Sequence, residues 1–152
     1  MKKIIRVVFW ASIGVIIIKM GKTFFKIRSY TKFAVFGGIN EKFETIELTD
    51  KSYATIFGGV NIDLRKVTLP QTGTTINIYS RFGGVNIKLP KNWNVTMEGT
   101  SKHSEIRNVA EFDIKNKTAP QLKIVHDLKF SGMNISIPKA ESSLTEKLEK
   151  TD

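Results

Sequence analysis

The sequence repeats one short phrase four times: an aromatic residue, a glycine-containing step, an aliphatic residue and an asparagine. The copies occupy residues 36–40 (FGGIN), 57–61 (FGGVN), 82–86 (FGGVN) and 130–134 (FSGMN). After three of them, aliphatic residues recur at every second position, as in Val60, Ile62 and Leu64. This alternation predicts a β-strand that buries one face and leaves the other in solvent.

The spacing of the copies predicts how the strands are arranged. Successive copies begin 21, 25 and 48 residues apart. Because the last gap is close to twice the others, we expect a degenerate copy within residues 99–108, where GTSKHSEIRN replaces the glycine pair. About five repeats of this length are typical of a stacked, β-solenoid-like fold. The predicted fold class is therefore all-β, with an irregular β-sandwich as the alternative.

Each residue of the phrase has an expected structural role. Glycine reaches positive φ and has no Cβ, so the glycine step is expected to permit a bend or bulge and a close approach of neighbouring backbones. The phenylalanine before it is predicted to anchor the core. The asparagine takes the first outward position, and we expect a ladder of stacked side-chain amides from Asn40, Asn61, Asn86 and Asn134.

The segments between the copies also favour extended backbone. Proline, which lacks an amide proton, is a natural strand stop at positions 70, 90 and 138. One β domain is therefore predicted over residues 33–138. Its further strands are expected at residues 45–48, 54–56, 67–69, 75–79, 93–97, 112–114 and 122–125.

Residues 1–32 differ from the rest of the chain. They carry eight basic and no acidic side chains, whereas the remaining 120 residues have a net charge of only +2. Residues 4–25 are mostly apolar, and the long stems of their cations can reach the headgroups of a bilayer. We predict that residues 4–25 form a single-pass membrane anchor and that residues 1–32 comprise this anchor and a basic linker. A helix lying in the membrane plane and a cleavable signal peptide are the alternatives.

The distribution of cations around the predicted span indicates its orientation. Three cations precede the apolar segment and five follow it by Lys32. The excess of positive charge after the span favours a cytoplasmic C-terminal domain. Since the basic character belongs to the anchor, anionic lipid is the expected partner and nucleic acid is not.

The last segment, residues 139–152, is rich in Ala, Ser, Thr, Glu and Lys. Leu144 and Leu148 are four residues apart, which is compatible with a narrow apolar stripe on a helix. The composition favours a solvated tail, with a short partner-docking helix as the alternative.

The sequence contains no pattern that indicates a catalytic, cofactor or metal site. Cysteine is absent, and His103 and His126 are 23 residues apart in unlike contexts. The acids Glu47, Asp63, Glu111 and Asp113 stand singly at positions typical of a solvated sheet face. The glycine pairs precede strands rather than helices, which argues against a phosphate-binding loop. We expect no enzyme activity, no cofactor and no metal.

The repeated FGG[IV]N phrase, the extension FGGVNIDL at residues 57–64 and the closing GMNISIP at residues 132–138 resemble the C-terminal domain of LiaF-like proteins, the cell-wall-active antibiotics response family. That domain belongs to the all-β modules called toastrack domains, and the resemblance covers residues 33–138. It implies a membrane-attached, non-enzymatic β domain, in the best-known cases a negative regulator of a sensor histidine kinase in envelope-stress signalling. LiaF-type proteins usually carry several transmembrane helices before the domain, whereas this chain has one short candidate span.

Three functional hypotheses follow from the sequence. The first is a membrane-tethered interaction or regulatory module that contacts a membrane protein such as a sensor kinase. The second is a scaffold, in which exposed strand edges stack subunits into a homo-oligomer at the membrane. The third is an enzyme acting on envelope glycans or lipids, which would require a cleft with converging acids.

Overall fold

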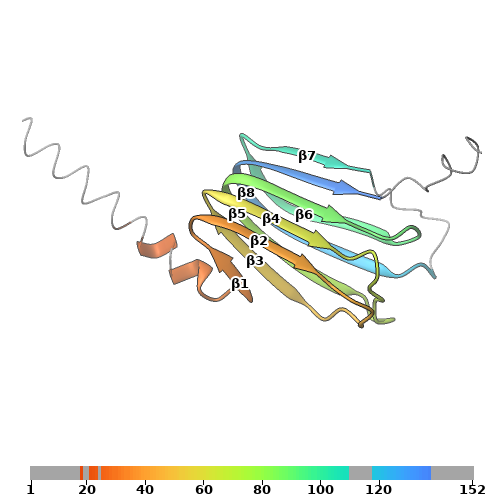
Figure 1. The fold of residues 1–152 in the computed structure, drawn as a ribbon. Helices are drawn as coiled ribbons and strands as arrows, with labels where there is room; N and C mark the ends of the chain where they lie inside the picture. The colour runs from red at the N-terminus through yellow and green to blue at the C-terminus, as the bar shows by residue number, and fades with distance from the viewer. Residues whose placement is uncertain (1–17, 19–20, 24, 110–117, 138–152) are drawn as a thin grey trace, which may run out of the picture.

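The computed structural model describes residues 18, 21–23, 25–109 and 118–137 (Figure 1). This part of the chain is mostly β-sheet, as predicted, and residues 18, 21–23 and 25–27 are helical. The strands are β1 (Lys32–Ala34), β2 (Gly37–Lys42), β3 (Lys51–Ile56), β4 (Gly58–Asp63), β5 (Thr74–Lys88), β6 (Asn94–Lys102), β7 (Glu105–Asn108) and β8 (Gln121–Ser136).

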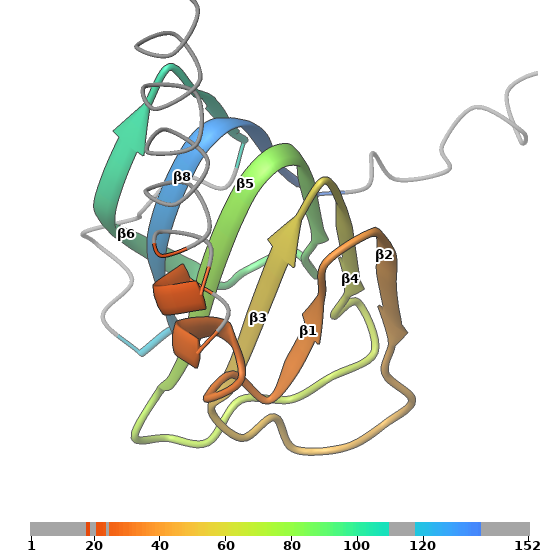
Figure 2. The same ribbon diagram turned by 90° about the vertical axis from the view of Figure 1, so that its left-hand side faces the viewer.

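The strands form one sheet that folds over on itself (Figure 2). In each repeat the chain runs along a first arm, turns at a corner and returns along a second arm. β1, β3 and β6 are first arms and β2, β4 and β7 are second arms, while the long strands β5 and β8 pass through the corner and supply both. Every pairing between strands of the described chain is parallel, so equivalent residues of different repeats lie side by side.

The register confirms the degenerate repeat within residues 99–108. Ile106 of β7 pairs with Met133 of β8, and Glu105 pairs with Gly132. His103 therefore occupies the position that phenylalanine holds in the other copies. The spatial order of the repeats nevertheless differs from a simple stack. β8, the last repeat in sequence, lies between β5 and the β6–β7 repeat.

The core lies between the two arms of the folded sheet. Val60, Val85 and Met133 are aligned across neighbouring strands and are buried, as are the aliphatic residues two positions later. First-arm residues such as Ile76 and Ile124 pack against them in the same cluster. The predicted inward alternation is therefore confirmed, and the burial of this cluster from both sides drives the fold.

The expectation that glycine supplies the bend holds at the first corner, where Gly37 has a φ of 102°, but not at the second, third and last corners. At the second, third and last corners, the residues with positive φ are Phe57, Phe82 and Phe130, with φ of 54°, 53° and 52°. In the second and third pairs the first glycine is needed because the strands approach closely, whereas a Cβ on Gly37 would meet nothing within 4 Å. A Cβ on Gly58 would lie 1.7 Å from the carbonyl oxygen of Gly37, and a Cβ on Gly83 would lie 1.7 Å from that of Gly58.

Some strand predictions were wrong or fall outside the described residues. Residues 45–48 and 67–69 do not form strands and contribute only a single bridge between Glu47 and Thr68. The strand predicted at residues 112–114, the tail at 139–152 and residues 4–17, 19–20 and 24 of the anchor lie outside the described chain. Within the described residues, no helix has the length and apolar character needed to cross a membrane.

The two glycines of one pair provide a matched test of the close approach. We expect Gly83→Ala to lower the free energy of unfolding by about 3 kcal/mol, the upper end of the cost of overpacking, because the clash is with backbone. A Cβ on Gly84 would meet nothing within 4 Å. Gly84→Ala should therefore change stability by less than about 1 kcal/mol, in the stabilising direction. Urea unfolding of the full chain in detergent measures both, and equal effects would contradict the interpretation.

Candidate functional site

A row of stacked aromatic rings runs along the corners of the sheet. We call Phe36, Phe57, Phe82, Phe130 and His103 the aromatic ridge, in their spatial order. Successive ring centroids are 5.5, 5.0, 5.1 and 4.9 Å apart, and the planes differ by 11°, 7°, 9° and 8°. The parallel register produces this stack because it places the same position of every repeat at the same corner.

The ridge lies in solvent, so the prediction that its phenylalanines anchor the core was wrong. Phe36, Phe57, Phe82 and Phe130 are 77%, 46%, 48% and 45% exposed. At the corner the chain leaves one arm and enters the other, and a side chain at the turning residue points away from both. A positive φ costs a residue with a Cβ about 1–2 kcal/mol. Stacking contributes about 0.5–1.5 kcal/mol for each aromatic pair and helps to offset this cost.

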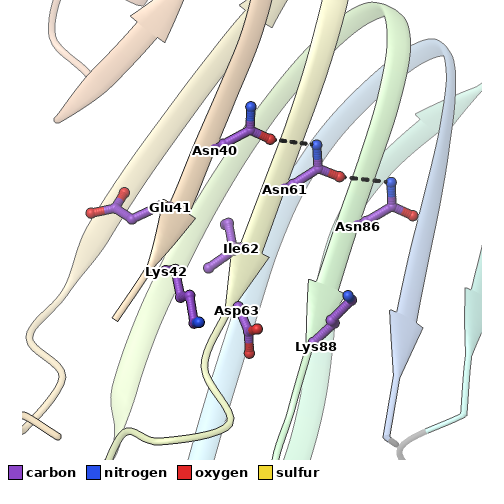
Figure 3. A pocket seen from close by; sticks show the side chains of 8 residues that line it. All are labelled: Asn40, Glu41, Lys42, Asn61, Ile62, Asp63, Asn86 and Lys88. Carbon is purple, nitrogen blue, oxygen red and sulfur yellow. Dashed lines mark hydrogen bonds between the residues drawn. The ribbon is translucent and has the colours of Figure 1, made fainter. Parts of the chain in front are cut away.

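The outward asparagines form the expected ladder on the second arm (Figure 3). The Asn61 Nδ2 amide donates to the side-chain oxygen Oδ1 of Asn40 at 2.8 Å, and the Asn86 Nδ2 amide donates to Oδ1 of Asn61 at 3.0 Å. Asn134 occupies the next register position, beside Asn86. The ladder prediction is confirmed for the first three asparagines, whose amides satisfy one another across adjacent strands.

The ladder borders a shallow hollow of about 260 Å³, whose charged lining residues are Glu41, Lys42, Asp63 and Lys88 (Figure 3). Arg65 donates to the Asp63 carboxylate at 2.8 and 2.7 Å. These hydrogen bonds lower the pKa of Asp63 to about 2. A carboxylate held in this way stays ionised near neutral pH, which makes it a poor general acid or base.

Glu41 does not belong to the solvated face, although it lines the hollow. It pairs in register with the buried Ile62, so it stands at an inward position of the first repeat, where it forms an ion pair with Lys32 at 3.1 Å. Burial raises the pKa of the neighbouring Tyr53, and Glu41 raises it further. A charged pair thus occupies the end of the core where the other repeats have aliphatic side chains.

The end of the N-terminal helix is fixed to the outer face of the first arms. Ile27 is fully buried in a small cluster with Ala54 and Tyr79. Lys26 lies 4.8 Å from the centroid of the Tyr79 ring and 3.2 Å from the Asp127 carboxylate. We call this group, completed by Arg81, the helix clamp (Figure 2 shows the helix over this face).

Arg81 joins the two strands under the clamp. Its guanidinium stacks 4.1 Å from the Tyr79 ring centroid and donates to the Asp127 carboxylate at 2.8 Å and to the Asp127 carbonyl at 2.9 Å. Burial alone would raise the pKa of Asp127, but the hydrogen bonds from Arg81 and Lys26 outweigh it and lower that pKa. The clamp therefore links the end of the N-terminal helix to β5 and β8, the central strands of the sheet.

The two histidines have unlike environments. His103 ends the aromatic ridge and is exposed. His126 is buried at an inward position of β8, and its Nδ1 has no hydrogen-bond partner within the described structure. Burial lowers the pKa of His126, and the nearby Asp127 opposes this only in part. Burial therefore disfavours the charged form of this imidazole.

The β domain matches a known protein family. Residues 35–129 match the family described as cell wall-active antibiotics response LiaF, C-terminal. The chain belongs to the LiaF-like family. The LiaF-like match includes the first three corners, His103 and the bonded part of the asparagine ladder, and it begins after the helical residues of the clamp. Comparisons with curated proteins and with solved structures give no significant match.

The sequence does contain a signal that the rings of the ridge are exposed, and the prediction of a core role overlooked it. In the second copy, Phe57 and Asn61 have odd numbers, whereas the buried Val60, Ile62 and Leu64 have even numbers. Alternation with period two therefore places the ring on the asparagine side of the LiaF-like repeat. The clamp had no comparable signal, because Lys26, Arg81 and Asp127 become neighbours only through the fold.

The buried imidazole predicts a pH dependence of stability. Because the pKa of His126 is lower in the folded chain than its ordinary value of 6.5, protonation favours unfolding. Stability should be full above pH 6.5 and should decrease as the pH falls below it. Protonation of Asp63 and Asp127, whose pKa values are also lowered, should reduce stability only once the pH falls below their ordinary pKa of 3.8.

Thermal unfolding of the full chain between pH 7.5 and 4.5 checks this expectation. His126→Leu should flatten the decrease below pH 6.5, whereas His103→Gln, which replaces an exposed ring, should keep the wild-type profile. A wild-type decrease that survives in the His126 variant would contradict the assignment.

Proposed function

We propose that this protein is a membrane-tethered, non-enzymatic regulatory module in the response to cell-wall-active antibiotics, and that its partner is a membrane sensor kinase. Membership of the LiaF-like family supports a role in that response. In this proposal residues 4–25 hold the chain at the cell membrane as a single-pass anchor, with the C-terminal domain in the cytoplasm. The excess of cations after the apolar segment supports this orientation.

The observation that carries the proposal is the helix clamp. A domain joined to a membrane by a flexible linker would leave that linker solvated. Here Ile27 is fully buried on the sheet and Lys26 pairs with Asp127, so the chain that enters the domain is held in one place. Such a connection fixes the β domain relative to its tether and allows the domain to present one surface to a neighbour in the membrane.

The chemistry of the hollow beside the asparagine ladder does not favour catalysis. Asp63 is ionised and occupied by Arg65, and Glu41 turns inward to Lys32. These two acids do not converge on a common point from which a proton could be transferred. The surrounding asparagine amides are already bonded to one another.

Assembly through strand edges is the second function to consider, and the first repeat argues against it. Within the described chain, β1 and β2 pair only with β3 and β4, so they form an edge of the sheet. β1 is only three residues long, and the inward Glu41 places a carboxylate where a continuing stack would need an apolar side chain. Short edge strands and inward charges oppose edge-to-edge pairing.

Complementation in the native host tests the proposal. Three variants would be introduced into a strain lacking the protein and carrying a reporter of the cell-wall stress response. Removal of residues 1–20 spares the clamp and should release the chain from the membrane fraction and abolish control of the reporter. Ile27→Asp should leave the chain in the membrane fraction but abolish control, because a buried charge detaches the helix from the sheet. Ile46→Asp, at an exposed position, is the matched control and should behave as the wild type. Full control by the truncated chain would refute the tethered mechanism.

A further inference from the structure

We propose that the aromatic ridge is a lipid-contacting edge, which lies at the boundary between headgroups and acyl chains of the bilayer that holds the tether. This inference rests on the proposed membrane attachment and adds a surface of the β domain to it. The ridge has no role in the core, since its four phenylalanines are each 45% or more exposed. A soluble surface rarely carries a continuous row of such side chains without a partner.

The orientation of the rings indicates the chemistry of the partner. Neighbouring rings are nearly parallel and about 5 Å apart, so they cover each other's faces. Sugars and nucleic-acid bases stack on free aromatic faces, and here only the two ends of the row could offer one. The four phenylalanines of the row present ring edges that are apolar C–H groups, and His103 at its end is the one ring with polar nitrogens. Such a surface suits hydrocarbon.

The position of the ridge agrees with a membrane on that side. Figure 1 shows the helical residues 18, 21–23 and 25–27 at the same end of the molecule as the corners of the sheet, and Figure 2 shows them over the outer face of the first arms. The clamp holds Ile27 there, and Phe36 follows only nine residues later. A bilayer that takes up residues 4–25 therefore lies close to the first ring. Phe25 and Ile18, which belong to the proposed tether, are also exposed.

The charge around the ridge is complementary to anionic headgroups. Lys102 and Lys129 each stand directly before a ring residue, pair with each other in register and are exposed. The Lys129 ammonium lies 5.7 Å from the Phe130 ring centroid. Two acids lie nearby in the sequence. The charge of Asp127 is already paired with Arg81 and Lys26, and Glu105, two residues after His103, is at the histidine end of the row. Lysines beside exposed rings are typical of surfaces that bind the membrane interface.

Site-specific fluorescence tests the proposal on the full chain. The protein contains no cysteine, so a single introduced thiol can be labelled without other changes. We would label Phe82→Cys on the ridge and, as a matched control, Ile46→Cys, since the two native side chains have nearly equal exposure of 48% and 47%. Each labelled chain would be reconstituted in vesicles of phosphatidylcholine and phosphatidylglycerol with brominated acyl chains, which quench a fluorophore that reaches them.

The ridge label should lose most of its emission and the control label should keep most of it. Replacing Phe57 and Phe130 by asparagine, a residue that tolerates positive φ, should restore the emission of the ridge label while circular dichroism remains that of the folded chain. If the chain floats with the vesicles but the ridge label is not quenched, the lipid-contact proposal is overturned and the tether stands. If the chain does not float, the proposed membrane attachment itself fails.

A second copy of the chain is the competing occupant of the ridge. Pyrene at the same cysteine distinguishes it, because two ridges in contact bring the dyes together and give excimer emission. Excimer emission that persists when the labelled chain is diluted with lipid would overturn the proposal in favour of a ridge-to-ridge dimer. Monomer emission together with quenching by brominated lipid would support lipid contact.

Discussion

The close approach of neighbouring backbones at the corners is the constraint on which the rest of the structure depends. A Cβ on Gly58 or Gly83 would meet the carbonyl oxygen of the preceding repeat at 1.7 Å, so these repeats can lie this close only where the side chain is a hydrogen atom. Once the corners are aligned, parallel pairing carries the same register along both arms. The aliphatic core, the asparagine ladder and the aromatic ridge all follow from that alignment.

Much of the fold could be predicted because the pattern and spacing of residues within each repeat indicate it. Alternation of aliphatic residues identified the inward face, and the doubled gap before Phe130 identified the degenerate repeat. The order of the repeats could not be predicted, since β8 and the β6–β7 repeat carry similar patterns and the choice of neighbour depends on pairing energies across the whole sheet. The asparagine at the end of the phrase was assigned correctly, whereas its aromatic first residue was not.

The error at the ridge has a physical cause. Phenylalanine is usually buried, and that tendency was given more weight than the phase of the alternation. The phase is the stronger constraint in a sheet, because a strand cannot turn one side chain inward without shifting all its neighbours. The helix clamp shows the opposite situation. Its residues come from separate segments of the chain, and their association is a tertiary property without a periodic signal.

The contrast between the two ends of the phrase bears on function. At the asparagine end, polar side chains satisfy one another and leave few groups for a partner. At the phenylalanine end, the rings cover one another's faces but still leave apolar edges in water, and three of the four phenylalanines have a positive φ, which carries a cost. A polar residue such as asparagine would adopt that conformation more easily, and His103 shows that an aromatic ring other than phenylalanine is accommodated in the stack. Stability of the corner alone therefore does not account for four phenylalanines in a row. The apolar partner proposed for the ridge would account for them, because burial of the ring edges would remove their unfavourable contact with water and leave the parallel register unchanged.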